Sequence, residues 1–256
     1  MVVRRRTRTR GKGRSAVHEK PLTNSVHVVQ GERVHMPVDV RAATGITAQF
    51  LVPAGPARDT LAAAGLEPVT PIPGRVPATL GFIHYLDCDL GEYHEFLVAL
   101  MCRQPGVRGS TGVFIHWLPV DQTFTCEAGQ NIWGFPKEIS TIDVSTRGKR
   151  TRCEVRLENR PVVALEFGRG VPAPSAMGAM TLDAYTHRDG VLRRTPWTMR
   201  AGGTRMRPAG ARVELGDHPI SDDLRRLGFP RKSLFTNHIG ELTMRFADAT
   251  TISSRS

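Results

Sequence analysis

The sequence of 256 residues lacks the short motifs that mark the commonest enzyme classes. It contains no GxxxxGK[ST], HExxH or GxSxG motif, and no GxGxxG after a strand-like segment. The sequence therefore gives no support for a phosphate-binding loop, a zincin metal site, a hydrolase nucleophile elbow or a dinucleotide-binding site. The nine histidines are scattered without the spacing of metal ligands. We expect neither a metal nor a cofactor.

Cysteine is scarce and long apolar runs are missing. The spacings between the four cysteines, 14, 24 and 27 residues, include no CxxC pair, which argues against a closed zinc site and a disulfide framework. No segment approaches the roughly 18–20 consecutive apolar residues of a membrane span, and no secretory signal is recognisable. We expect a cytoplasmic protein with no membrane association and with reduced thiols in or near its core: Cys88, Cys102, Cys126 and Cys153.

Positive charge is abundant but concentrated at one end. The formal net charge is +11, of which residues 1–20 carry +7 with eight Arg and Lys against one Glu. Dense like charge with few apolar residues cannot bury enough surface to become ordered. We predict a disordered basic tail over 1–20: a solubilising extension, the product of a start codon placed too far upstream, or a transit peptide. A nucleic-acid arm is disfavoured because aromatic residues do not interleave with the basic ones.

The rest of the chain reads as many short strands. The segment "SVHVVQGERVHMPVDVRAA" alternates apolar and polar residues around Gly31, as two strands around a turn would. Similar alternating runs follow at regular spacing. Further hairpin tips are marked by three dipeptides: Arg147-Gly148, Glu158-Asn159 and Asp189-Gly190.

Helix signals are few. One short helix is predicted over 58–64, closed by Gly65, and another from Ser221 to Gly228. The segment "CEAGQNIWGFPKEISTIDVS" is expected to lead into a strand. This pattern indicates a mainly β (α+β) fold, an antiparallel barrel or sandwich with a few peripheral helices. With no internal repeat, we predict a single domain over 21–256.

One lysine lies among apolar residues in the sequence. The stretch "NIWGFPKEIS" places Lys137 after Trp133, Phe135 and Pro136. Burial disfavours the ammonium form and lowers the pKa of a fully buried lysine by roughly 3–5, which yields a neutral amine able to attack a ketone. The plain alternative is a lysine whose stem follows a strand while its head stays in water.

A family resemblance favours the first interpretation. "AGQNIWGFPKEI", with "LPVDQTFTCE" before it, resembles the active-site segment of the acetoacetate decarboxylase family, whose Schiff-base lysine follows an aromatic-proline pair. "GERVHMPVDVR" and "DLGEYHE" resemble two earlier segments of that family in the same order. The resemblance runs from about Val26 to Phe167. This family is itself a standing example of a catalytic lysine activated by desolvation or a nearby cation.

The resemblance implies a fold and a site. The fold is a closed antiparallel β-barrel or sandwich with an interior pocket. Lys137 would form the imine, Glu95 would position substrate or handle protons, and Arg33 would hold a carboxylate or balance the pocket charge. A plain salt bridge is the alternative role for Glu95 and Arg33. The wall residues and proton donors that complete the expected site are Trp133, Phe135, Met36, Tyr85 and Tyr93.

The sequence departs from the family pattern at two places. Glu138 stands where the family has a second lysine, and "ATLGFIHYL" offers no carboxylate where the family has a second acid. Successive residues on a strand point to opposite faces, so Glu138 is expected to point away from Lys137.

We therefore expect a Schiff-base lyase acting on a small or medium keto acid. The alternatives are an aldolase-dehydratase acting on pyruvate-type substrates and a non-catalytic ligand-binding barrel. The resemblance also implies a homo-oligomer.

Overall fold

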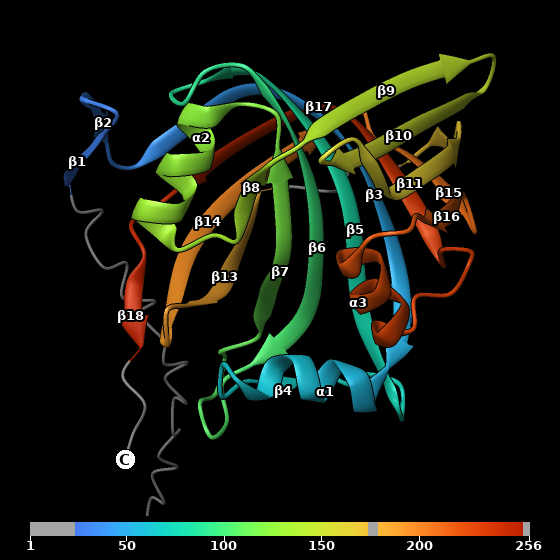
Figure 1. The fold of residues 1–256 in the computed structure, drawn as a ribbon, viewed down its shortest axis with the longest axis horizontal. Helices are drawn as coiled ribbons and strands as arrows, with labels where there is room; N and C mark the ends of the chain where they lie inside the picture. Colours follow the sequence, from blue (N-terminus) through green and yellow to red (C-terminus); the bar gives the residue numbers. More distant parts are fainter. Residues whose placement is uncertain (1–23, 174–178, 253–256) are drawn as a thin grey trace, which may run out of the picture.

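The computed structural model describes residues 24–173 and 179–252, so the predicted tail lies outside the described residues. Seven strands form a hydrogen-bonded ring in which β14 pairs back with β17 (Figure 1). Neighbours in the ring are antiparallel except β7 and β13, which are parallel. The closed, mostly antiparallel barrel expected from the sequence is therefore confirmed. Its strands are β3 (Val38–Pro53), β5 (Arg75–Cys88), β6 (Tyr93–Arg103), β7 (Gly112–Val120), β13 (Met180–Arg188), β14 (Val191–Gly202) and β17 (Phe235–Phe246).

A second sheet of four strands packs on the outside of the barrel, and its β9–β10 hairpin extends away from the body (Figure 1). The cluster between the two sheets joins Leu80 and Phe96 of the barrel to Val155 and Phe167 of the outer sheet. The outer strands are, in spatial order, β16 (Ala211–Leu215), β11 (Arg160–Gly168), β10 (Arg150–Leu157) and β9 (Thr141–Arg147).

Shorter elements complete the described part of the chain. A hairpin of β1 (Val26–Val29) and β2 (Glu32–His35) stands apart from both sheets. The remaining strands are β4 (Glu67–Pro68), β8 (Lys137–Ile139), β12 (Val171–Pro172), β15 (Arg205–Pro208) and β18 (Thr250–Ile252). None of the helices in the described ranges has both the length and the apolar character needed to cross a membrane.

Strand alternation separates two cores. On β5, Leu80 and Phe82 face the outer sheet, while Ile83 and Tyr85 face the barrel interior. Because side chains of a strand alternate between its faces, one strand serves both clusters. The interior cluster is the one that contains Trp133 and the cavity described below.

The helices differ from the sequence prediction at their beginnings. Helix α1 (Ala54–Ala62) starts four residues earlier than predicted, and α3 (Pro219–Leu227) is capped by the side chain of His218, which accepts from the Ile220 amide. In α3 the cap is a histidine followed by a proline, and a histidine cap is a weaker sequence signal than the predicted serine cap. The end of α3 at the left-handed Gly228 agrees with the prediction.

One helical segment was not predicted. Residues expected to lead directly into a strand form α2 (Thr123–Ala128), continued by a π-helix over Gly129–Trp133. The side chain of Gln122 accepts the Thr125 amide at 2.6 Å, and left-handed Gly134 ends the helical path. A six-residue α-helix is too short to show a helical repeat in the sequence.

The predicted hairpin tips and thiols are confirmed. Positive φ angles occur at all three tips, as turns between twisted strands require. All four cysteines are buried and none forms a disulfide.

The parallel contact between β7 and β13 predicts where the barrel is least tolerant of added volume. A Cβ on Gly112 would lie 2.8 Å from Cε2 of Tyr185 and closer still to the carbonyl oxygen of Asp183. We expect Gly112→Ala to lower the free energy of unfolding by about 1–3 kcal/mol, measured by urea denaturation. Gly55→Ala, where added volume meets nothing within 4 Å, is the matched control. Equal stability of the two variants would show that the contact between β7 and β13 tolerates added volume at Gly112.

Candidate active site

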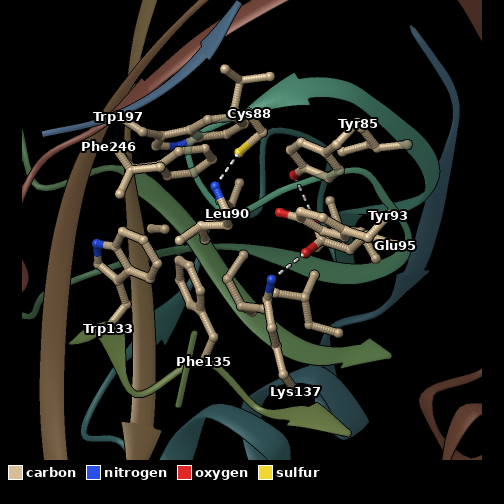
Figure 2. A pocket seen from close by; sticks show the side chains of 18 residues that line it. Tyr85, Cys88, Leu90, Tyr93, Glu95, Trp133, Phe135, Lys137, Trp197 and Phe246 are labelled. Carbon is tan, nitrogen blue, oxygen red and sulfur yellow. Dashed lines mark hydrogen bonds and ion pairs between the residues drawn. The ribbon is translucent and has the colours of Figure 1, made fainter. Parts of the chain in front are cut away.

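The barrel interior holds a largely apolar cavity of about 60 Å³. This is several times the roughly 10–15 Å³ that one water molecule needs, so the space suits a small organic molecule. Eighteen side chains line it, drawn mostly from the barrel strands and from the segment after α2 (Figure 2). Among the described residues that line it, only Lys137 and Glu95 are charged.

Lys137 enters this cavity because of the turn that precedes it. Left-handed Gly134 ends the π-helix, and β8 then pairs in parallel with β7, with Lys137 opposite Leu118. Lys137 is 5 % exposed. The next residue, Glu138, points to the opposite face, where its carboxylate accepts from the indole N–H of Trp117. Glu138 therefore does not face the cavity, as the strand alternation predicted.

The amine of Lys137 has three partners. Its Nζ lies 2.9 Å from Oε2 of Glu95, donates to Oγ1 of Thr125 at 3.0 Å, and lies 4.9 Å from the ring centroid of Tyr93 (Figure 2). The contact with Glu95 is a buried ion pair, in which the ammonium of Lys137 is the partner of Oε2.

One tyrosine contacts the carboxylate of Glu95, and a second stacks on the first. The hydroxyl of Tyr85 donates to Oε1 of Glu95 at 2.9 Å, and its ring stacks on that of Tyr93 with centroids 4.2 Å apart. Burial, followed by the negative charge of Glu95, raises the pKa of both Tyr85 and Tyr93 well above the ordinary value. Both phenols therefore stay protonated over the whole neutral range and can act as hydrogen-bond donors.

An aromatic wall closes the side of the cavity that faces β14 and β17. Trp133 stacks on Phe135 at 5.5 Å, and Trp197 stacks on Phe246 at 5.4 Å. The indole N–H of Trp133 donates to the carbonyl oxygen of Ala247 at 2.8 Å, so this ring has a fixed orientation. These rings exclude water from the neighbourhood of the amine, which strengthens electrostatic interactions there.

The structure brings most of the predicted site together. Side chains of six predicted residues line one cavity: Lys137, Glu95, Trp133, Phe135, Tyr85 and Tyr93. Met36 is buried in the interior cluster but does not line the cavity.

Arg33 is not brought to the cavity. It lies exposed on β2 opposite Val28, because Val34 is the residue of that strand that turns inward.

Other lining or contacting residues were missed: Thr125, Cys88, Trp197 and Phe246. Trp197 and Phe246 are far from the lysine motif in sequence, so no local pattern could point to them. Thr125 lies inside "LPVDQTFTCE", and the helical spacing of Thr125 and Gly129 was the available signal. Burial raises the pKa of the Cys88 thiol to about 11, so it is a neutral wall group.

The helix before Lys137 holds the whole side chain. Thr125 accepts from its Nζ, Gln130 donates to its carbonyl oxygen at 2.6 Å, and Gly129 leaves room for its stem. A Cβ on Gly129 would lie 2.5 Å from Cδ and 2.8 Å from Cε of Lys137. Gly129 has ordinary right-handed helical angles, so space rather than backbone conformation explains the glycine. The described residues contain no group of three or more His, Cys, Asp or Glu side chains arranged to hold a metal ion.

The close packing of Gly129 against the Lys137 stem predicts that Gly129→Ala lowers the reactivity of the amine more than the stability of the fold. The methyl group would displace the lysine stem from Glu95 and Thr125, and a misplacement of about 1 Å can cost roughly a hundredfold in rate. We expect the rate of borohydride trapping of a carbonyl compound on Lys137 to fall at least tenfold, followed by mass spectrometry. Gly55→Ala should trap at the parent rate. A trapping rate equal to that of the parent protein in folded Gly129→Ala would show that the space left by Gly129 has no role in the reactivity of Lys137.

Comparison with known proteins agrees with the fold. The sequence model of the family described as "Acetoacetate decarboxylase (ADC)" matches residues 24–251. An acetoacetate decarboxylase from Legionella pneumophila has a similar structure, with 14 % identity, a TM-score of 0.66, and coverage of 92 % of this chain and 93 % of that one. No curated protein is significantly similar in sequence.

Two further solved structures are similar. The enduracididine biosynthesis enzyme MppR is 18 % identical with a TM-score of 0.60, over 86 % of this chain and 89 % of its own. An acetoacetate decarboxylase-like enzyme from Sphingomonas wittichii RW1 is 15 % identical with a TM-score of 0.62, over 90 % of this chain and 100 % of its own. At these identities the structures show the fold, and the family match covers nearly all the described residues. The chain belongs to the acetoacetate decarboxylase family.

Proposed function

We propose that the protein is an imine-forming lyase in which Lys137 attacks the ketone carbonyl of a small or medium carbonyl substrate, a keto acid in the pattern of the family. The observation that carries the proposal is the position of Nζ, buried in an apolar cavity and 2.9 Å from a carboxylate. Nucleophilic lysines of this kind need desolvation and a group that takes the proton.

The ion pair supplies the nucleophile. Transfer of one proton from Nζ to Glu95 converts ammonium and carboxylate into amine and carboxylic acid, and the pair has zero net charge in both forms. The amine then adds to the substrate carbonyl and gives a carbinolamine. Glu95, oriented by Tyr85, returns a proton to the leaving hydroxyl, which departs as water and leaves an iminium ion.

The iminium ion draws electrons from a neighbouring bond. In a 3-keto acid the bond to the carboxylate breaks, carbon dioxide leaves, and the electron pair forms an enamine. A proton taken up from water and relayed by Glu95 then protonates the enamine carbon, and hydrolysis of the resulting iminium releases the ketone and restores Lys137. Glu95 relays these protons, because its Oε2 lies 2.9 Å from Nζ and its Oε1 accepts from the Tyr85 hydroxyl at 2.9 Å.

Aldol chemistry is the second candidate, because it begins from the same iminium. MppR has been solved with pyruvate and with the condensation product of pyruvate and imidazole 4-carboxaldehyde. In that route the enamine attacks an aldehyde, and Lys137 and Glu95 are again sufficient. The third candidate is a ligand-binding barrel without catalytic activity.

Borohydride trapping tests the proposed function. The protein is incubated with acetoacetate, pyruvate or the uncharged 2,4-pentanedione, reduced, and mapped by peptide mass spectrometry. We expect an adduct on Lys137 with at least one of these compounds and none in Lys137→Arg. The absence of an adduct with every carbonyl compound would favour the ligand-binding barrel.

Removal of the carboxylate tests the proton transfers. Glu95→Gln keeps the shape of the side chain but cannot carry the proton, and general acid–base catalysis contributes roughly 10²–10⁴-fold. We expect the trapping rate to fall within that range, with a smaller loss in Tyr85→Phe, which only releases the orientation of Glu95. Unchanged trapping in Glu95→Gln would exclude Glu95 as the acid and base.

A further inference from the structure

A second hollow lies on the outside of the molecule, at the β16 edge of the outer sheet and beside α3 (Figure 1). It is an open groove of about 690 Å³ and shares no lining residue with the barrel cavity. Small-molecule sites usually have volumes of roughly 300–1,000 Å³, so the groove is large enough for a ligand of that size. It is lined by residues of β16, of the end of α3 and of the segment that follows α3.

The charge in this groove is mostly positive. One lining residue is an anion, Glu214, and four are cations: Arg212, Arg225, Arg231 and Lys232. Glu214 is already paired with Arg152 at 2.7 Å. Within the part of the chain that the structure describes, no ion pair is formed by Arg212, Arg231 or Lys232. Three positive charges of the groove are therefore not offset by the described residues.

Two of these cations lie directly opposite each other. Lys232 forms an antiparallel bridge with Arg212, and beside it the Val213 amide donates to the carbonyl oxygen of Arg231 at 3.1 Å. Side chains at such opposed positions have Cβ atoms roughly 4.5–5.5 Å apart, and like charges there are destabilising. An anion bound between the two side chains would replace this repulsion with two attractive contacts.

A further cation of the groove is held in place by its neighbours. The guanidinium of Arg225 donates to the carbonyl oxygens of Leu215 at 3.2 Å and Gly216 at 2.6 Å, and to the carboxylate of Asp222 at 2.6 Å. A side chain that is already ordered loses less conformational entropy when a ligand binds. Arginine and lysine are also the side chains that recognise phosphate groups, the first through its planar fork and the second as a point charge.

Apolar surface lies beside the cations. Val213 and Leu215 contribute it from β16, and Phe229 contributes it from the segment after α3. The half-buried ring of Phe229 packs edge-to-face on Phe50, with centroids 5.4 Å apart, so its position is fixed by the core. An inorganic anion would leave this surface in water, whereas a ligand with an aromatic or aliphatic part would cover it.

We propose that this groove binds a small organic phosphate, with its phosphate groups between Arg212, Lys232 and Arg231 and its apolar part against Phe229. Nothing in this site depends on Lys137, so the proposal stands or falls independently of the imine chemistry. The same charges would attract a nucleic acid or an anionic lipid surface, but the volume of the groove and its apolar side match a small molecule.

ADP is the probe, because it joins two phosphate groups to a planar base. Its dissociation constant for the full-length protein is measured by isothermal titration calorimetry at about 0.15 M salt, which screens long-range attraction to the basic residues of 1–20. We expect a value below about 1 mM, and about fivefold or more below that of pyrophosphate, which carries a similar charge without the base. Absence of ADP binding, or equal affinity for pyrophosphate, would overturn the proposal.

Lys232→Glu separates ligand binding from a structural role of the cations. The substitution places opposite charges across the bridge to Arg212, so the urea midpoint should not fall, while the affinity for ADP should fall about tenfold or more. Lys149→Glu is the matched control, since Lys149 is exposed at the tip of the β9–β10 hairpin and the net charge changes equally. It should bind ADP with the parent affinity. A loss of affinity in both variants or in neither would contradict the assignment of the groove.

Two larger anions test the class of ligand. Vesicles containing phosphatidylserine and a single-stranded oligonucleotide are each mixed with the parent protein and with Lys232→Glu. We expect the substitution to leave the binding of both unchanged. If either binds through Lys232 and ADP does not bind, the groove serves a membrane or a nucleic acid, and the assignment to a small organic phosphate is wrong.

Discussion

The candidate active site of this molecule depends on a buried ion pair between Lys137 and Glu95. Both side chains are almost completely buried, at 5 % and 4 % exposure, in a cavity that otherwise contributes no charge from its described lining. Replacing such a pair with apolar residues is often neutral or even stabilising, because desolvation offsets most of the attraction. Stability therefore does not explain the pair. In the proposed mechanism its value is chemical, since one proton moved over a short distance turns it into an amine and an acid.

The barrel holds the two partners on different kinds of element. Glu95 lies on β6 opposite Ile83 of β5, and its Oε1 accepts from the hydroxyl of Tyr85, whose ring stacks on that of Tyr93. Lys137 begins a three-residue strand whose position depends on the preceding α- and π-helix. π-Helical turns occur often at functional sites, and here the turn brings Gly129 against the lysine stem. In the proposed mechanism, the rigid sheet supplies the acid and the irregular segment supplies the nucleophile.

How much the sequence could predict follows from the range of each signal. Strand alternation and turn dipeptides predicted the β-rich barrel. The lysine motif with its family resemblance predicted Lys137, Glu95 and the two tyrosines as pocket residues, and all four line the cavity. Local patterns could not identify Trp197 and Phe246, because they reach the cavity only through ring closure between β14 and β17. Arg33 shows the opposite error, since a matching motif does not fix the outward direction of a hairpin residue.

The most direct measurement is a crystal structure of the protein after incubation with 2,4-pentanedione. The account predicts continuous electron density from Nζ of Lys137 to a carbonyl carbon of the diketone, with the remaining oxygen near Glu95 and Tyr85 and a methyl end against the aromatic wall. Density elsewhere, or an unmodified Lys137 still paired with Glu95 at saturating ligand, would contradict the central claim.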